Sequence, residues 1–196
     1  MALGSATVQA IPAPQPFSNG SFEEPSTTPI PGGYLNLPSG STAIDSWTVV
    51  SGNIDWISTY WTTPFGARSL DLSGTDAGSI SQTFATTQGK QYQVSFWMAG
   101  NPDGGLPTKH LNVSAWAAST DYTFNTAGHS DTSMGWTEEF FYFTAGGPAT
   151  TLTFTSGDHS NAGPALDNVS VPLPPSALLL GSGLLGLVGL RRKLKG

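Results

Sequence analysis

The chain of 196 residues contains no cysteine. This absence excludes disulfide bonds, catalysis by a thiol and zinc sites built from cysteine. If the protein is exported, its stability must come from packing alone or from packing together with a metal ion.

Basic residues are scarce, with seven Lys and Arg against thirteen Asp and Glu. Only Arg68, Lys90 and Lys109 precede the C-terminal segment, whereas all of the acidic residues do. Phosphate binding needs a basic stripe, so this distribution excludes nucleic acid as a partner. The excess of carboxylates is compatible with calcium binding and, equally, with general solubility.

Recognisable catalytic motifs are also lacking. The spacing of His110, His129 and His159 matches no zinc-binding histidine motif, and the chain has no Gly-x-Ser-x-Gly nucleophile motif. A glycosidase needs two carboxylates at a defined separation, and thirteen acidic residues provide some such pair by chance. We therefore predict that the protein is not an enzyme, with a polysaccharide hydrolase as an alternative.

No segment before residue 172 has the apolar periodicity of an amphipathic helix. Short segments rich in Thr, Val, Ile and aromatic residues are instead separated by Gly, Pro, Asn and Asp. We predict nine strands, at residues 47–50, 53–57, 69–72, 79–84, 91–98, 110–116, 137–144, 150–155 and 166–171. This pattern predicts an all-β fold, a jelly-roll β-sandwich. The Pro-rich and Gly-rich segment 26–43 is expected to be a long functional loop.

The chain ends in an uncharged apolar segment, residues 176–190, followed directly by Arg191, Arg192 and Lys193. A helix of this length rises about 22 Å, which is short for a hydrocarbon core of roughly 30 Å. The basic end is expected to stay in the cytoplasm, which places the preceding residues outside it. A buried core helix and an ordinary tail anchor are the alternatives.

Read in order, Val171, Pro172 and Pro174, the apolar segment and the basic end resemble the PEP-CTERM sorting signal of bacterial surface proteins. Leu173 stands where many of these signals have Glu. The resemblance implies an exported protein of a Gram-negative type of bacterium, with an inner-membrane intermediate and an exosortase as processing partner. The mature protein would then lie at the cell surface or in the extracellular matrix, without a transmembrane helix.

Residues 1–16 are rich in Pro and Ala and predict a disordered leader. They lack the basic start and the apolar run of a signal peptide, so we expect the true signal peptide to lie upstream of Met1. The predicted organisation is a leader at 1–16, a β-sandwich at 17–171 and a hydrophobic sorting helix within 172–196.

Five short motifs follow one another along the predicted sandwich. They are Asn-Gly-Ser-Phe-Glu from residue 19, Gly-x-Ile-Asp-Trp from 52, Leu-Asp-Leu-x-Gly from 70, Gly-x-Ile-x-Gln from 78 and Leu-Asp-Asn-Val-x-Val from 166. Their order and spacing resemble the choice-of-anchor C family and related plant cell-wall proteins with galactose-binding-like folds. In a sandwich whose first and last strands lie side by side, the first and last motifs would meet.

The resemblance to carbohydrate-binding jelly rolls also implies a structural Ca²⁺ ion between the two ends of the domain. Glu23 and Asp167 would hold it, and backbone carbonyl groups with Asn19, Ser21 or Asn168 would supply the remaining oxygen ligands. Such an ion would close the sandwich. The alternative is a solvated Glu23 and an Asp167 that only forms a turn.

The densest aromatic cluster of the chain is at residues 55–61. Sugar sites combine an aromatic face with a few polar groups, so we predict that Tyr60 and Trp61 form an exposed platform near Arg68. Asp103 and His159 are further candidate ligand residues, although their loops also have turn chemistry. Three other aromatic residues are expected to be structural: Trp47, Trp56 and Trp97.

Together, these features predict a secreted, surface-sorted and noncatalytic β-sandwich protein. Its expected partner is an extracellular polysaccharide or a cell-envelope glycan. A structural matrix or adhesion protein, with protein partners and no sugar site, is the alternative.

Overall fold

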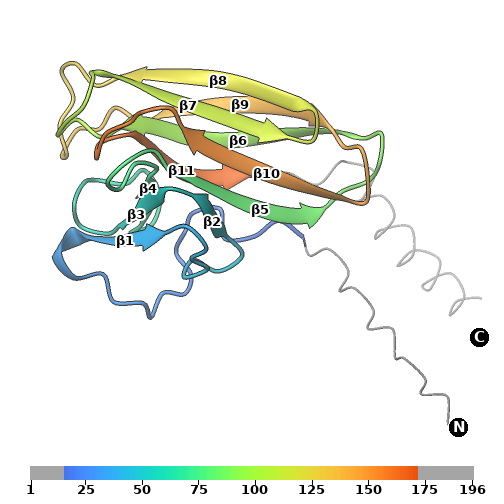
Figure 1. Cartoon of the computed structure of the whole chain (residues 1–196), viewed down its shortest axis with the longest axis horizontal. Helices are drawn as coiled ribbons and strands as arrows, with labels where there is room; N and C mark the ends of the chain where they lie inside the picture. The colour runs from blue at the N-terminus through green and yellow to red at the C-terminus, as the bar shows by residue number, and fades with distance from the viewer. Residues whose placement is uncertain (1–15, 172–196) are drawn as a thin grey trace, which may run out of the picture.

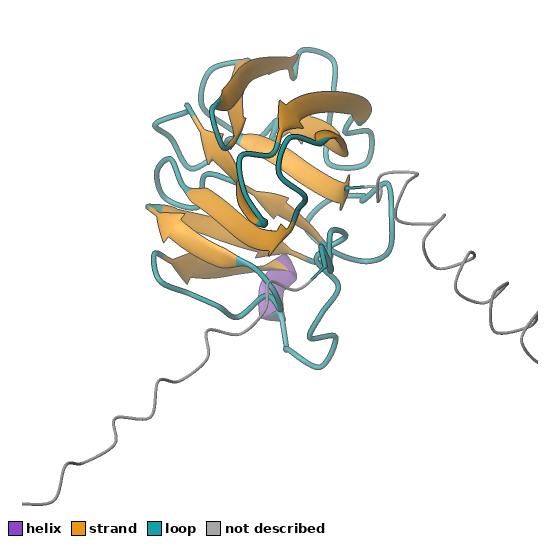
Figure 2. Ribbon diagram, turned by 90° about the vertical axis from the view of Figure 1, so that its right-hand side faces the viewer, coloured by secondary structure: helices purple, strands orange, loops and turns teal. Residues whose placement is uncertain are grey.

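A computed structural model describes residues 16–171, which form two antiparallel β-sheets packed face to face (Figures 1 and 2). The first sheet has the strand order β1-β3-β4-β11-β6-β9 and the second the order β2-β5-β10-β7-β8. A single 3₁₀ turn, η1 (Pro31–Gly33), precedes β1. The predicted all-β sandwich is therefore confirmed. The predicted leader, and the sorting residues from Pro172 onward, lie outside the described residues.

The strands of the first sheet are β1 (Tyr34–Pro38), β3 (Asn53–Ile57), β4 (Ser69–Asp71), β11 (Pro164–Ser170), β6 (Gln91–Gly100) and β9 (Thr137–Thr144). Those of the second sheet are β2 (Thr48–Ser51), β5 (Ser79–Ala85), β10 (Ala149–Ser156), β7 (Thr108–Ala115) and β8 (Ala118–Asn125). All nine predicted strands are present, with boundaries that differ by a few residues.

Two strands, β1 and β8, were not predicted. β1 lies inside the segment that the sequence assigns to a loop, and it ends in Pro38, which an edge strand tolerates. β8 is the edge strand of the second sheet, and most of its side chains are exposed. In β8, Ala118, Tyr122 and Phe124 do alternate with polar residues, so this strand was within reach of sequence reasoning, whereas β1 offers only the short pair Leu35 and Leu37.

The core between the sheets is rich in aromatic residues. Trp47, Trp56, Phe96 and Phe154 are buried, as the sequence predicts for the two tryptophans. Phe96 and Phe154 meet edge to face, with ring centroids 5.3 Å apart. Burial of each such side chain contributes about 1.5–3 kcal/mol. This large apolar interior is consistent with a domain that has no disulfide to stabilise it.

The N-terminal segment runs beside the end of β11. The Val169 amide donates to the Gly20 carbonyl at 2.8 Å, which confirms that the first and last motifs meet. The indole of Trp47 donates to the carbonyl of Asn19 at 2.8 Å, and that of Trp56 donates to Phe22 at 2.9 Å. The two core tryptophans therefore hold this segment through its backbone.

The outer face of the first sheet, which is turned away from the second sheet, is partly covered by the loop at residues 58–68. Trp61 in this loop donates its indole N–H to Ser69 Oγ at 2.8 Å. Phe65 packs on Trp97 with ring centroids 5.3 Å apart. Trp97 is half-buried under this loop rather than in the core between the sheets. Beside the loop, the outer face remains open and forms a pocket.

Within residues 16–171, the structure contains no helix that is long and apolar enough to cross a membrane.

Candidate functional site

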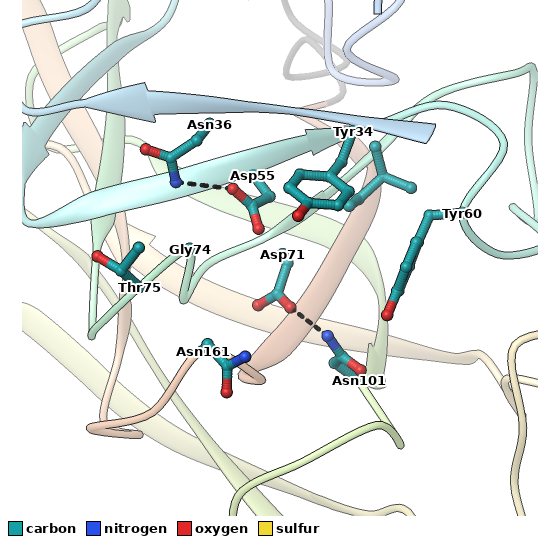
Figure 3. A pocket seen from close by; sticks show the side chains of 10 residues that line it. Tyr34, Asn36, Asp55, Tyr60, Asp71, Gly74, Thr75, Asn101 and Asn161 are labelled. Atoms are coloured by element: carbon teal, nitrogen blue, oxygen red, sulfur yellow. Dashed lines mark hydrogen bonds between the residues drawn. The ribbon is translucent and has the colours of Figure 1, made fainter. Parts of the chain in front are cut away.

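The pocket on the outer face of the first sheet has a volume of about 460 Å³. Its floor is a row of polar side chains from three neighbouring strands, because Asn36 faces Asp55 across the β1–β3 ladder and Asp55 faces Asp71 across the β3–β4 ladder. Residues directly opposite each other in a sheet share one face. We call this the carboxylate pocket; it is lined by Tyr34, Asn36, Asp55, Ile57, Tyr60, Asp71, Gly74, Thr75, Asn101 and Asn161 (Figure 3).

Asp71 lies at the bottom of the carboxylate pocket with only 1% of its surface exposed. Its Oδ1 accepts hydrogen bonds from the Ser73 amide at 2.9 Å and the Gly163 amide at 3.1 Å, and its Oδ2 accepts from Asn101 Nδ2 at 2.8 Å. Burial raises the pKa of the Asp71 carboxyl to about 7, although these hydrogen bonds oppose the shift. Asp71 is therefore fixed in position and titrates near neutral pH.

Asp55 is the second carboxylate of the floor. Its Oδ1 accepts a hydrogen bond from Asn36 Nδ2 at 2.7 Å, and burial raises the pKa of Asp55 despite that bond. The charge of Asp55 in turn contributes to the raised pKa of Asp71. Figure 3 shows the two hydrogen-bonded pairs in the lining of the pocket, Asn36 with Asp55 and Asp71 with Asn101, as dashed lines.

Two tyrosines form the aromatic rim of the carboxylate pocket. Tyr34 on β1 is 46% exposed, and its ring meets that of Tyr60 edge to face with centroids 5.6 Å apart. Tyr60 donates its hydroxyl to Asp103 Oδ2 at 2.6 Å, and this hydrogen bond is the main reason why the pKa of Tyr60 is raised. The rim is therefore held in place by the loop that follows β6.

A buried lysine connects the two loops that close the carboxylate pocket on the β6 side. Lys109 is fully buried, and its Nζ donates to the carbonyls of Gly104 at 2.5 Å and Ala162 at 2.7 Å. Burial lowers the pKa of Lys109, an effect that the nearby Asp158 and Asp71 carboxylates oppose. These two loops carry Asn101 and Asn161, so Lys109 supports two lining residues without lying in the pocket itself.

The structure separates the residues that the sequence grouped into one sugar platform. Tyr60 lines the carboxylate pocket and Asp103 holds Tyr60. Trp61 is only 5% exposed, so the prediction that it forms an exposed platform is wrong. The Trp61 indole is bonded to the Ser69 hydroxyl, whereas the neighbouring Tyr60 ring, whose centroid is 5.7 Å from that of Trp61, lines the pocket.

Arg68 and His159 lie away from the carboxylate pocket. The guanidinium of Arg68 stacks over Trp56, 4.3 Å from the ring centroid, and Nη2 donates to the carbonyls of Ser26 and Thr28 at 3.0 Å. Arg68 is therefore part of the support for the N-terminal loop. His159 is exposed, pairs with Asp76 at 3.0 Å and lines a separate hollow.

The two carboxylates of the predicted calcium site come together on the same outer face, beneath the loop at 58–68. Glu23 Oε1 accepts from the amides of Ala67 at 2.8 Å and Arg68 at 2.9 Å, and Asp167 Oδ2 accepts from Phe65 at 3.4 Å. Asp167 is fully buried, and burial, with a contribution from Glu23, raises its pKa to about 8. Among the described residues, neither carboxylate pairs with a basic side chain.

This arrangement fits a hard, oxygen-liganded cation, since it brings the buried carboxylate of Asp167 near the half-buried carboxylate of Glu23. Residues 16–171 contain no cluster of three His, Asp or Glu side chains that could hold a metal, so backbone oxygens would have to complete the set. Asn19 is engaged elsewhere: its Nδ2 donates to the carbonyls of Glu24 and Asp45, and its Oδ1 accepts from the Glu24 amide. Ser21 lies half-buried in the same turn.

A comparison with known protein families assigns this chain to one of them. The model of the family described as "Protein of unknown function (DUF642)" matches residues 15–172, which include the whole sandwich. The chain belongs to the DUF642 family. A curated relative is halomucin of Haloquadratum walsbyi, which is 33% identical over 180 residues. The alignment covers 86% of this chain and 2% of halomucin, so the chain spans only a small part of that relative.

Solved structures similar to this DUF642 chain include carbohydrate-binding modules. One is TmCBM61 in complex with β-1,4-galactotriose, at 16% identity and a TM-score of 0.45 over 82% of this chain and 99% of that one. Another is the CBM22-1 xylan-binding domain from Paenibacillus barcinonensis Xyn10C, at 17% identity and a TM-score of 0.46 over 74% of this chain and 97% of that one.

Sequence reasoning missed the floor of the pocket in this DUF642 chain. In the sequence, Asp55 and Asp71 stand within the motifs Ile-Asp-Trp and Leu-Asp-Leu, and nothing in those motifs assigns them to a binding site. Asp is rare within strands, so two such residues between buried apolar neighbours were an available signal for a polar site on one sheet face. Asn36 carried no such signal, because its strand was itself not predicted.

Proposed function

We propose that the carboxylate pocket binds uncharged sugar residues of an extracellular polysaccharide or cell-envelope glycan, and that it does so without catalysis. The observation that carries this proposal is the combination of an aromatic rim, with one exposed and one half-buried ring, and a fixed polar floor. The rim is Tyr34 and Tyr60, and the floor is Asn36, Asp55, Asp71 and Asn101. A volume of about 460 Å³ is within the usual range for small-ligand pockets.

The chemistry of the lining matches that of a sugar ring. The faces of Tyr34 and Tyr60 cover C–H surface, while carboxylates accept and amides both donate and accept hydrogen bonds with hydroxyl groups. Asn161 and Thr75 extend this polar set at the edge of the pocket. Because Asp71 and Tyr60 are held by hydrogen bonds before any ligand arrives, little entropy is lost in ordering them on binding.

The charge of the pocket favours uncharged sugars over uronic acids. Asp55 and Asp71 form its floor, and Asp103 is bonded to Tyr60 of its rim, whereas no basic side chain lines the pocket and Lys109 is buried behind the loops and bonded to carbonyls. A carboxylated sugar would meet like charges in a partly buried site, which is unfavourable. A neutral hexose or pentose polymer is therefore the expected ligand class.

The position of the two carboxylates argues against hydrolysis. Glycosidases place their two carboxyl groups on either side of the scissile bond. Asp55 and Asp71 are neighbours on one sheet face and both form the floor, so they reach the same side of a bound sugar. In addition, both oxygens of Asp71 already accept hydrogen bonds. The carboxylates of Asp55 and Asp71 are therefore suited to accepting hydrogen bonds from the hydroxyl groups of a sugar.

A structural Ca²⁺ ion at Glu23 and Asp167 is part of this proposal. It would neutralise the buried Asp167 and the half-buried Glu23 and connect the N-terminal segment, β11 and the loop at 65–68. That loop adjoins Tyr60, so an ion here would stabilise the fold next to the carboxylate pocket. The ion would have no direct role in sugar binding.

We further propose that the protein is exported and sorted to the cell surface through its C-terminal segment, with an exosortase as processing partner. The support is the order of Val171, Pro172, Pro174 and the basic residues from Arg191 in the sequence. Mass spectrometry of the protein from its native cells tests this proposal. Loss of the segment after Pro174 is expected, and an intact C-terminus on a cytoplasmic protein would contradict it.

A glycan-binding screen of the purified chain tests the central proposal. Retention of neutral polysaccharides, and weaker retention by a Tyr34→Ala variant, is the expected result. Failure to retain any glycan, together with specific capture of a matrix protein, would favour the alternative of a structural or adhesion protein with protein partners.

A further inference from the structure

A second aromatic site lies at the opposite end of the sandwich, on the turn between β7 and β8. Trp116 occupies this turn with 65% of its surface exposed, more than any other described tryptophan. Its backbone has a φ of 54°, in the left-handed region that a bulky residue rarely adopts. Core packing does not explain why a residue with an unfavourable backbone conformation carries a large ring that is exposed to solvent.

The indole ring is nevertheless fixed in place. It packs against Gly146 in the loop between β9 and β10, where a Cβ atom would overlap the ring. Gly146 therefore permits a close approach that no other residue type would allow. One side of the indole rests on this loop and the rest faces solvent, so the ring is ordered before any ligand arrives.

Trp116 lines two hollows at once, one on each side of the turn. The hollow on the second sheet has a volume of about 360 Å³, and hydroxyl groups line it from Ser114, Thr151 and Thr153. The hollow on the first sheet has a volume of about 480 Å³, with polar groups from Gln91, Tyr142 and Thr144. Among the described residues, no charged side chain lines either hollow.

We propose that Trp116 is the platform of a second sugar-binding site, specific for neutral pyranose residues of a polysaccharide. We call it the Trp116 platform; it comprises Trp116, Gly146 and the two hollows. An aromatic face covers the C–H surface of a sugar ring, and uncharged hydroxyl and amide groups match its hydroxyls. A membrane surface would call for basic residues here, and a protein interface would call for a larger apolar patch.

The two sites lie at opposite ends of one strand. Gln91, the first residue of β6, lines the Trp116 platform, and Asn101, directly after the last residue of β6, lines the carboxylate pocket. Ten residues of β6 span about 33 Å at roughly 3.3 Å per residue. Figure 1 shows the β7–β8 turn at one end of the sandwich and the loop after β6 at the other. Two such sites allow one chain to cross-link two polysaccharide strands.

Titration calorimetry of the full chain with β-1,4-linked gluco-, xylo- and galactohexaose tests the platform. Wild type should bind the preferred sugar at two sites per chain, with a change in tryptophan emission. Trp116→Asn should lose one site and the emission change, because Asn tolerates the left-handed turn but has no ring. Trp116→Phe should keep the site with reduced affinity. Gly146→Ala should weaken the same site at least tenfold, because its added methyl group displaces the indole.

Control variants separate this inference from the proposed function. Val50→Ala changes an exposed residue that lines neither site and should bind as wild type does. Tyr34→Ala should affect only the carboxylate pocket. Binding that Trp116→Asn abolishes and Tyr34→Ala leaves unchanged would support the platform and refute the carboxylate pocket. Unchanged stoichiometry and affinity in Trp116→Asn, or no binding of any probe by wild type, would overturn the platform.

Discussion

Asp55 and Asp71 lie directly opposite each other on β3 and β4, with both carboxyl groups on the outer face of the first sheet. Like charges in this position destabilise a sheet. The fold maintains the pair because amide groups from Asn36, Ser73, Gly163 and Asn101 donate to the two carboxyls. A stability cost at the floor of a pocket is typical of a functional site.

The first prediction concerns stability as a function of pH. Folding raises the pKa of Asp71 from 3.8 to about 7, so the native state binds the proton more tightly than the unfolded state. The resulting stabilisation is fully present below about pH 4 and is lost as the pH rises to 7. The free energy of unfolding should therefore fall less in Asp71→Asn than in wild type over this pH range, by on the order of a few kcal/mol. Urea unfolding between pH 4 and 8 measures it.

The matched control for that experiment is Asp45→Asn, which changes an exposed carboxylate. Asp167, whose pKa is raised to about 8, should leave a residual slope of the same sign in the Asp71→Asn variant. A profile of Asp71→Asn with the same slope as wild type would contradict the assignment of this titration to Asp71.

The second prediction concerns calcium. Added Ca²⁺ should raise the melting temperature of the chain, and a chelator should lower it again, because the ion binds only the folded Glu23 and Asp167 pair. Glu23→Gln should abolish the response to Ca²⁺. Glu24→Gln is the matched control at the adjacent position, since Glu24 is bonded instead to the Ser26 amide. A melting temperature that is the same in Ca²⁺ and in chelator would refute the calcium site.

The third prediction concerns Lys109. Lys109→Met keeps the volume of the side chain but leaves the carbonyls of Gly104 and Ala162 without their donor. Each buried group left unsatisfied costs about 1–3 kcal/mol. We expect a lower melting temperature and faster amide exchange in both loops, with weaker sugar binding through Asn101 and Asn161. Lys90→Met, at an exposed position, should change none of these quantities. Unaltered exchange would show that Lys109 does not hold the loops.

The strands of the core were predictable because the alternation of apolar residues is visible in the local sequence. Tyr92, Val94, Phe96 and Met98 alternate in the sequence, and all four are buried on β6. The meeting of the two chain ends was also predictable from the motifs, as the hydrogen bond between Val169 and Gly20 shows.

The carboxylate pocket was not predictable to the same degree, because it depends on which strands are neighbours. Asp55 and Asp71 are far enough apart in sequence that only the β3–β4 register brings them together. Of the neighbouring rings, Tyr60 lines the pocket while Trp61 is buried and bonded to Ser69, a tertiary contact. Neither the register nor this contact leaves a trace in the local sequence pattern.

The fourth prediction tests the central claim, that the carboxylate pocket binds a neutral polysaccharide. The measurement is the dissociation constant of the chain for the best neutral ligand of the screen, compared between wild type, Tyr34→Ala and Val50→Ala. Loss of the exposed ring should weaken binding at the pocket about tenfold, equivalent to about 1.4 kcal/mol, while Val50→Ala binds as wild type does. The claim would be contradicted if wild type, Tyr34→Ala and Val50→Ala bound the ligand with equal affinity and Asp55→Asn did not weaken that binding either.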